Sequence, residues 1–187
     1  MFPLHLVSYG IVATERGLWL GPYLGAVHGL EVIAQGHIAF AMSLGMALGA
    51  LACGPASRWF NGAKPPAILG NAMVIALLLA LGLFTGIGSG PAGVLLTLFG
   101  FFGLTYSLLF SHARQFMPDH LLGRGVTILN FLAIGGAGLL QAVTGHFMKR
   151  AMASGTPPTE AYALMHLAIA VCLTIALVIY LRAPAKP

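Results

Sequence analysis

The sequence predicts an all-α integral membrane protein, and three observations lead to that fold class. The 187 residues are 58% hydrophobic and only 7% charged, with a mean hydropathy of +0.91. A soluble domain carries roughly 25% charged residues, so this chain has too few charges to cover a water-exposed surface. The apolar residues also form runs of about twenty, the length that crosses a membrane as a helix, and no run alternates like a barrel strand.

Six membrane spans account for nearly all of the chain. Breaks at proline, glycine and charge clusters divide it into segments near residues 4–24, 37–57, 67–86, 92–113, 125–147 and 162–181. We predict helices because lipid offers no partner to a free backbone N–H or C=O group. The connections are short, so we expect a single transmembrane domain over residues 1–187 without a soluble domain.

The first span differs from the others in its charge. The stretch LVSYGIVATERGLWLGPYL, residues 6–24, is apolar except for Glu15 and Arg16 near its middle. A charge at that depth costs roughly 2.5–3.5 kcal/mol on insertion scales, and neighbouring helical side chains point about 100° apart. The two charges therefore cannot both face lipid without a large energetic cost. The span also lacks the basic start and cleavage site of a signal peptide, so we expect a retained helix.

Small residues recur every four positions in three of the spans. The stripes are Gly17, Gly21 and Gly25 in the first span, Ala41, Gly45, Gly49 and Cys53 in the second, and Gly138, Ala142 and His146 in the fifth. Such stripes allow close helix packing in lipid. The two cysteines, Cys53 and Cys172, show no metal-ligand spacing, so we expect packing roles for them and neither a metal nor a cofactor.

The distribution of Lys and Arg predicts the orientation. One side of the predicted bundle carries Arg58, Lys64, Arg114, Arg124, Arg182 and Lys186, whereas the other carries only Lys149 and Arg150. The cation-rich side is cytoplasmic by the positive-inside rule, which puts both termini in the cytoplasm. Because these cations are scattered singly, the net charge of +5 does not predict nucleic-acid binding.

No motif predicts enzymatic activity. The GIGSGP stretch, residues 86–91, has no preceding strand and is interpreted as a turn rather than a nucleotide-binding loop. The seven histidines are spread among loops and span ends, and the four acidic residues form no paired-carboxylate site. No Ser-His-Asp or Cys-His arrangement is identifiable.

Three stretches resemble the C-terminal six helices of a bacterial major facilitator superfamily transporter. They are GLWLGPYL in the first span, GPASRWFNGAK at residues 54–64, and FMPDHLLGRGVTILNFLAIGGAGLLQAVTG at residues 116–145. The family's loop signature fits Gly54, Arg58, Gly62 and Lys64, although Ser57 stands where an acid is expected. Gly123, Arg124 and Gly125 match the family's second-half pattern.

The resemblance implies a half-transporter made of two three-helix repeats. The expected function is secondary transport of a small polar solute, an anion among the candidates, across the cell inner membrane with protons as the coupling ion. Because the superfamily holds its solute between two six-helix halves, the expected partners are membrane lipid, the solute, and an N-terminal half or a second copy. The alternative from another class is a non-transporting membrane subunit or assembly module.

The resemblance also assigns candidate roles to individual residues. It makes Arg16 a candidate for an anionic solute group and Glu15 a proton carrier or a partner of Arg16, with Trp19 and Tyr23 nearby and Asn130 and Gln141 on a facing helix. The expected conformational residues of the cytoplasmic loops are Gly54, Arg58, Gly62, Lys64 and Arg124.

Other readings of the same residues stay open. The charged pair can form a structural clamp within the bundle, or the span can shift to bring the pair nearer to water. Hydrogen bonding between helices is the alternative role for Asn130 and Gln141.

Overall fold

The computed structural model describes residues 1–185, which are mostly helical and contain no strand. The first span is built from α1 (Phe2–Thr14), a π-helical segment η1 (Glu15–Trp19) and α2 (Leu20–His28). It is followed by α3 (Val32–Trp59), α4 (Lys64–Leu83), α5 (Ser89–Gly103), α6 (Tyr106–Arg114), the short 3-10 helix η2 (Asp119–Leu121), α7 (Leu122–Ala153) and α8 (Pro158–Leu181). Lys186, one of the cations used to predict orientation, lies outside the described residues.

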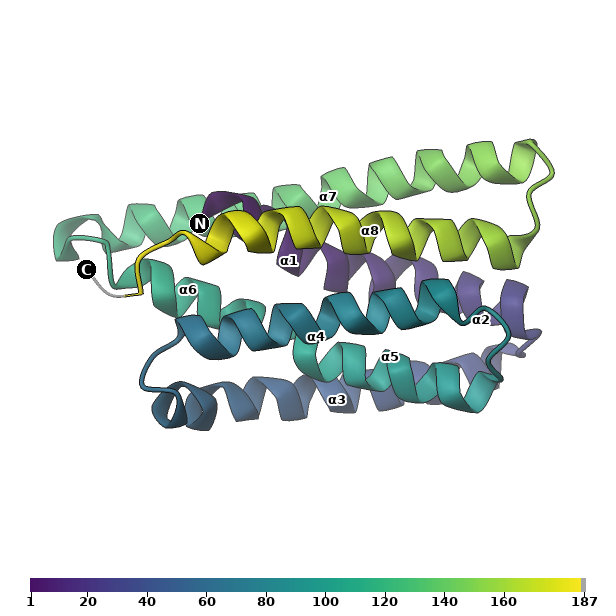
Figure 1. The fold of residues 1–187 in the computed structure, drawn as a ribbon, viewed down its shortest axis with the longest axis horizontal. Helices are drawn as coiled ribbons and strands as arrows, with labels where there is room; N and C mark the ends of the chain where they lie inside the picture. Colours follow the sequence, from purple (N-terminus) through teal and green to yellow (C-terminus); the bar gives the residue numbers. More distant parts are fainter. Residues whose placement is uncertain (186–187) are drawn as a thin grey trace.

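The helices lie side by side as a bundle (Figure 1). Both termini and the α3–α4 and α6–α7 connections lie at one end, and the α2–α3, α4–α5 and α7–α8 connections lie at the other. Five stretches are long and apolar enough to cross a membrane, namely Val32–Trp59, Lys64–Leu83, Ser89–Arg114, Asp119–Ala153 and Pro158–Leu181. The predicted class, an all-α multi-pass membrane protein, is confirmed.

The packing partners reveal two three-helix repeats. The first repeat is α1–η1–α2, α3 and α4, and the second is α5–α6, α7 and α8. The most extensive helix contacts are α1 with α7, α3 with α5, and α4 with α8. The first helix of each repeat thus packs against the second helix of the other repeat, while the two third helices pack together. Such exchange is expected when two similar repeats are related by a pseudo-two-fold axis.

Two glycines show why the exchanged helices come so close. A Cβ at Gly136 of α7 would collide with the carbonyl oxygen of Leu6 in α1, and one at Gly49 of α3 would collide with that of Phe101 in α5. The predicted packing role is thus confirmed for Gly49. In contrast, Gly17 and Gly138 border open space, with nothing within 4 Å of a Cβ. Farther along the first stripe, Gly21 and Gly25 lie against the Gln35 side chain of α3, so part of that stripe does contact another helix.

The first helix of each repeat is interrupted near its middle. Between α5 and α6 the backbone tightens. The Thr105 N–H donates to the Phe102 carbonyl and the Ser107 N–H donates to the Leu104 carbonyl, and each acceptor is three residues back in the chain. Between α1 and α2 it widens instead, and Leu20 N–H donates to the Glu15 carbonyl five residues back. The predicted span 92–113 is therefore two helices, and the charged pair lies in a π-helical turn.

Candidate functional site

The π-helical segment η1 is the centre of the candidate site. Its sequence, ERGLW, contains Gly17 and is followed by Gly21 and Pro22. Pro22 has no N–H to donate to the carbonyl of Leu18, so the α-helical hydrogen-bond pattern is broken just after the segment. Single π turns of this kind occur frequently at functional sites. The segment directs Glu15 into the bundle and leaves Arg16 exposed.

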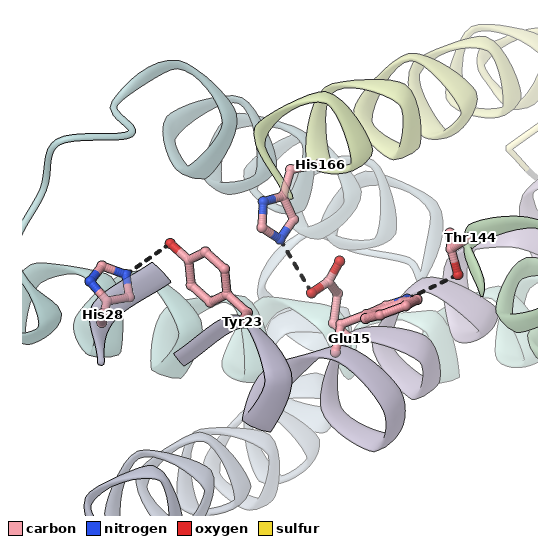
Figure 2. Close-up of polar contacts among 6 residues, drawn as sticks. Glu15, Tyr23, His28, Thr144 and His166 are labelled. Atoms are coloured by element: carbon pink, nitrogen blue, oxygen red, sulfur yellow. Dashed lines mark hydrogen bonds and ion pairs between the residues drawn. The ribbon is translucent and has the colours of Figure 1, made fainter. Parts of the chain in front are cut away.

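Glu15 faces α8 rather than Arg16. Its Oε2 lies 3.4 Å from Nε2 of His166, and the two side chains are only 2% and 0% exposed (Figure 2). No other carboxylate–cation contact at this distance is found among residues 1–185, and this one is an ion pair when His166 is protonated. It joins the first and last helices of the half. The hypothesis that Glu15 is the ionic partner of Arg16 is therefore not the geometry observed here, and the clamp that exists links Glu15 to His166.

Arg16 points to α3 and is exposed. Its Nε and Nη2 donate to Oγ of Ser43 at 3.2 and 2.8 Å. The Ser43 hydroxyl donates in turn to the Ala39 carbonyl at 2.7 Å, so its oxygen is oriented to accept from the guanidinium. No carboxylate pairs with Arg16 in the described part of the chain. The cation is positioned by one neutral hydroxyl and keeps its charge uncompensated.

Aromatic side chains surround the buried carboxylate of Glu15 on the side of the bundle end that carries the α2–α3 and α7–α8 connections (Figure 1). Trp19 Nε1 donates to Oγ1 of Thr144 in α7 at 2.9 Å, and its ring meets Tyr162 edge to face. Tyr23 is buried, with its ring edge-on to both Tyr162 and His166. Its hydroxyl lies 3.2 Å from Nε2 of His28 (Figure 2). Trp19 and Tyr23 therefore shape the surroundings of Glu15, while Arg16 turns away from them.

A groove lined by both polar and apolar side chains continues the exposed side of α1. It has a volume of about 370 Å³ and is lined by Tyr9, Tyr106, Ser107, Phe110, Val126, Asn130, Ala133 and Ile134. Tyr9 and Arg16 are seven residues apart, so they lie on one face of the helix about 10 Å from each other. We call Tyr9, Arg16, Ser43, Tyr106, Ser107 and Asn130 the open face.

The structure separates the two polar residues predicted on the fifth span. Asn130 is exposed and lines the groove beside α6. Gln141 is half-buried about 16 Å farther along α7, and its backbone carbonyl is a secondary acceptor for the Thr144 hydroxyl. Neither amide side chain forms a hydrogen bond among residues 1–185. Of the two, Asn130 belongs to the open face.

The predicted conformational residues lie at the end of the bundle that carries the termini (Figure 1). Lys64 is the best anchored, because its Nζ donates to the carbonyls of Leu181 and Ala183 at the end of α8. This is the expected role of a cation at a helix C-terminus. Gly62, at φ 155°, lies in the turn that precedes Lys64. The other three, Gly54, Arg58 and Arg124, are exposed on α3 and α7.

Sequence analysis missed the importance of His166. The sequence places the histidines in loops and at span ends, yet in the structure His166 is fully buried within α8 and faces Glu15. The available signal was an ionisable residue inside an apolar span, which is a functional candidate by default. Ser43 and Thr144 were also missed, because a hydroxyl in an apolar helix can bond its own backbone and so gives no sign of a partner elsewhere.

Comparison with known proteins identifies the fold. No protein family profile and no curated protein matches the sequence. Among solved structures, the inward-open conformation of the xylose transporter XylE from E. coli matches with a TM-score of 0.78 and 16% sequence identity. The match covers 100% of this chain and 46% of that protein, so the chain spans about half its length. The chain thus has the fold of about half of that transporter.

Proposed function

We propose that this chain is one half of a secondary transporter that moves a small polar, anionic solute across the bacterial cytoplasmic membrane by alternating access. The observation that carries the proposal is the exposed, uncompensated Arg16 near the middle of a helix in a transporter-like fold. A cation at that depth is costly unless water or a ligand reaches it. An aqueous solute pathway would supply both.

The chemistry of Arg16 favours an anion with a planar or tetrahedral group of oxygens. Ser43 accepts from Nε and Nη2, so the edge formed by Nη1 and Nη2 keeps donors that have no partner among the described residues. Such an edge binds carboxylate or phosphate oxygens in a bidentate manner. The neutral hydroxyls and amide of Tyr106, Ser107 and Asn130 add donors and acceptors along the open face. This set favours a small polar anion over an apolar one.

The open face supports a partner across the solute pathway. Its residues form one wall, and in the superfamily the solute lies between two six-helix halves. We propose an N-terminal six-helix half or a second copy of this chain as the opposite wall. Protons are the proposed coupling ion, with Glu15 as carrier, and the cation-rich end that includes both termini is proposed to face the cytoplasm.

Uptake by reconstituted vesicles tests the transport proposal. We expect vesicles that contain only this chain to show no saturable uptake of small carboxylates or phosphate, and vesicles that also contain a six-helix partner to show it. Arg16→Gln should abolish that uptake, whereas Arg16→Lys should retain part of it. Saturable uptake by this chain alone would instead identify a second copy as the partner. A partner that co-purifies but yields neither uptake nor anion binding would favour the assembly-module alternative.

The orientation is tested separately by labelling. Arg124→Cys should react with an impermeant thiol reagent only from the cytoplasmic side, and Lys149→Cys, at the opposite end of α7, only from outside. Both positions are exposed, so accessibility differs only through the membrane. The native Cys53 and Cys172 are replaced by alanine in both variants. External labelling at position 124 would reverse the proposed orientation.

A further inference from the structure

We propose that Glu15 and His166 form one binding site for a single proton, which the two side chains share while they are buried. The role of this site in coupling rests on the proposed transport function. The site itself is a property of the purified chain, and it adds to Glu15 a second residue from the last helix of the half.

The geometry isolates the pair from all other polar groups. Glu15 Oε2 and His166 Nε2 are 3.4 Å apart, at ion-pair distance but without the alignment of a good hydrogen bond. The second carboxylate oxygen of Glu15, Nδ1 of His166 and the hydroxyl of Thr14 are buried without a hydrogen-bond partner in residues 1–185. Each of the two ionisable groups therefore depends on the other for compensation.

The number of bound protons follows from the net charge. With no proton on either group the pair carries −1, with one it is neutral overall, and with two it carries +1. A net charge buried without a partner is strongly unfavourable, whereas a neutral pair avoids most of that cost. The observed burial of both side chains therefore fits one shared proton, on the imidazole beside a carboxylate or on the carboxyl beside a neutral imidazole.

No other ionisable group in the described chain lies where it could compensate a net charge on the Glu15–His166 pair. Two phenols lie nearby: the ring of Tyr23 in α2 is edge-on to His166, and the ring of Tyr162 in α8 is edge-on to Tyr23. Arg16 is directed to Ser43 on the opposite side. The ionisable residues of α7 and the start of α8 are all exposed, namely Arg124, His146, Lys149, Arg150 and Glu160. The one ionisable residue of α4, Lys64, is bound to the end of α8.

A transport cycle can use this site with balanced charge. When water reaches the pair, the shared proton passes to water and leaves a carboxylate and a neutral imidazole, with a net charge of −1. Uptake of one proton from water on the other side restores the neutral pair and permits burial. Since Glu15 and Arg16 are consecutive residues of η1, proton binding and solute binding act on the same short backbone segment.

The pH dependence of the folding stability reports how many protons the Glu15–His166 pair binds in the folded state. In the unfolded chain the carboxyl and imidazole titrate near pH values of about 4.3 and about 6.5, and stability falls with rising pH wherever the folded state binds more protons. Glu15→Gln removes one proton from the folded state and none from the unfolded state above about pH 5. The folding constant of the wild type relative to this variant should therefore fall about tenfold per pH unit between about pH 5 and 8.

Reversible unfolding in mixed micelles provides these constants. A double-mutant cycle at about pH 6 then tests whether His166 shares the site: Glu15→Gln and His166→Gln should be non-additive by about tenfold in the folding constant. The control cycle pairs Glu15→Gln with His112→Gln, which removes an equally buried imidazole bonded to Tyr180 rather than to a carboxylate. That cycle should be additive. A pH-independent ratio for Glu15→Gln, or additivity with His166→Gln, would overturn the proposal.

A second measurement needs no variant. Nitrogen NMR of the histidine side chains in the wild-type chain should show that the His166 imidazole neither gains nor loses a proton between about pH 5 and 8. Titration of the His166 signal within that range would contradict a shared proton. These results are independent of uptake: the proton site can be present in a chain that fails the transport test, and transport can be found without it.

Discussion

The first helices of the two repeats are interrupted at comparable positions but in opposite ways. In the first repeat the backbone widens into the π turn of Glu15–Trp19, and in the second it tightens at Leu104 and Thr105. The first interruption carries Glu15 and Arg16, whereas the second carries only uncharged polar residues, Thr105, Tyr106 and Ser107. The interruption is thus a feature of both repeats, and the charge is specific to one.

This difference has a physical basis. A π turn lets two consecutive charged side chains reach different surroundings, with Glu15 on the bundle side and Arg16 on the open face. The tightened turn between α5 and α6 contacts α4 closely, because a Cβ at Gly70 would collide with the Thr105 side chain. A charge at that position would have no room and no partner. The two interruptions therefore have different tasks, and mutations at each of them should have different effects.

The largest effect is expected at the close helix contacts, which both repeats need equally. Gly136→Ala should destabilise the bundle by on the order of 3 kcal/mol, because the new methyl group meets the Leu6 backbone and forces α1 and α7 apart. Gly49→Ala should cost a similar amount at the α3–α5 contact. Gly135→Ala is the matched control, since it borders open space. Equal stability of the variants at positions 135 and 136, measured by unfolding in micelles, would refute the close contact.

The next effect separates the charged interruption from the uncharged one. Arg16→Gln should weaken binding of an anionic solute by about 10- to 100-fold, the amount expected when a charge-assisted hydrogen bond of roughly 1.5–3 kcal/mol is lost. Ser107→Ala, at the uncharged interruption, should change affinity by less than about tenfold because a neutral hydrogen bond contributes roughly 0.5–1.5 kcal/mol. Isothermal titration with the assembled transporter measures both. Similar losses at both positions would mean that the two interruptions share the solute equally.

A smaller effect distinguishes two threonine hydroxyls. Thr144→Val leaves the partly buried indole N–H of Trp19 without its acceptor and should cost about 1–2 kcal/mol, in the lower half of the range for an unpaired buried donor. Thr105→Val removes only a bond from the hydroxyl to the Phe102 carbonyl and should cost about 0.5–1 kcal/mol. Thermal unfolding of the two isosteric variants gives the order. The reverse order would show that the α5–α6 turn depends more on its hydroxyl than the π turn depends on Trp19.

The smallest expected quantity is the coupling between Glu15 and Arg16. Because their partners lie on different helices, the costs of Glu15→Gln and Arg16→Gln should add to within about 0.5 kcal/mol. A clamp between the two residues predicts instead that the double variant recovers stability. Unfolding free energies of the wild type, the two single variants and the double variant decide between these outcomes.

Much of the fold was predictable because it depends on local composition. Apolar runs of about twenty residues predict membrane helices without knowledge of their neighbours, and the charged pair in the first span predicts an unusual site. The break at Leu104 and Thr105 was not predictable, since the stretch GFFGLTYSLLF around it reads as continuous apolar helix. The backbone hydrogen bonds of this break depend on how α5 and α6 pack against other helices, and the spacing of apolar residues in the sequence does not predict that packing.

The sequence by itself determined that this protein is an all-α membrane bundle, that its first span is exceptional, and that Glu15 and Arg16 point in different directions. Only the tertiary structure decided what each of them meets: His166, 151 positions away in α8, for Glu15, and Ser43 of α3 for Arg16. The physical reason is that the sequence patterns used for prediction describe only residues close to one another along the chain. Hydropathy and helical geometry act over a few turns, whereas a partner on another helix is fixed by the exchanged packing of the two repeats.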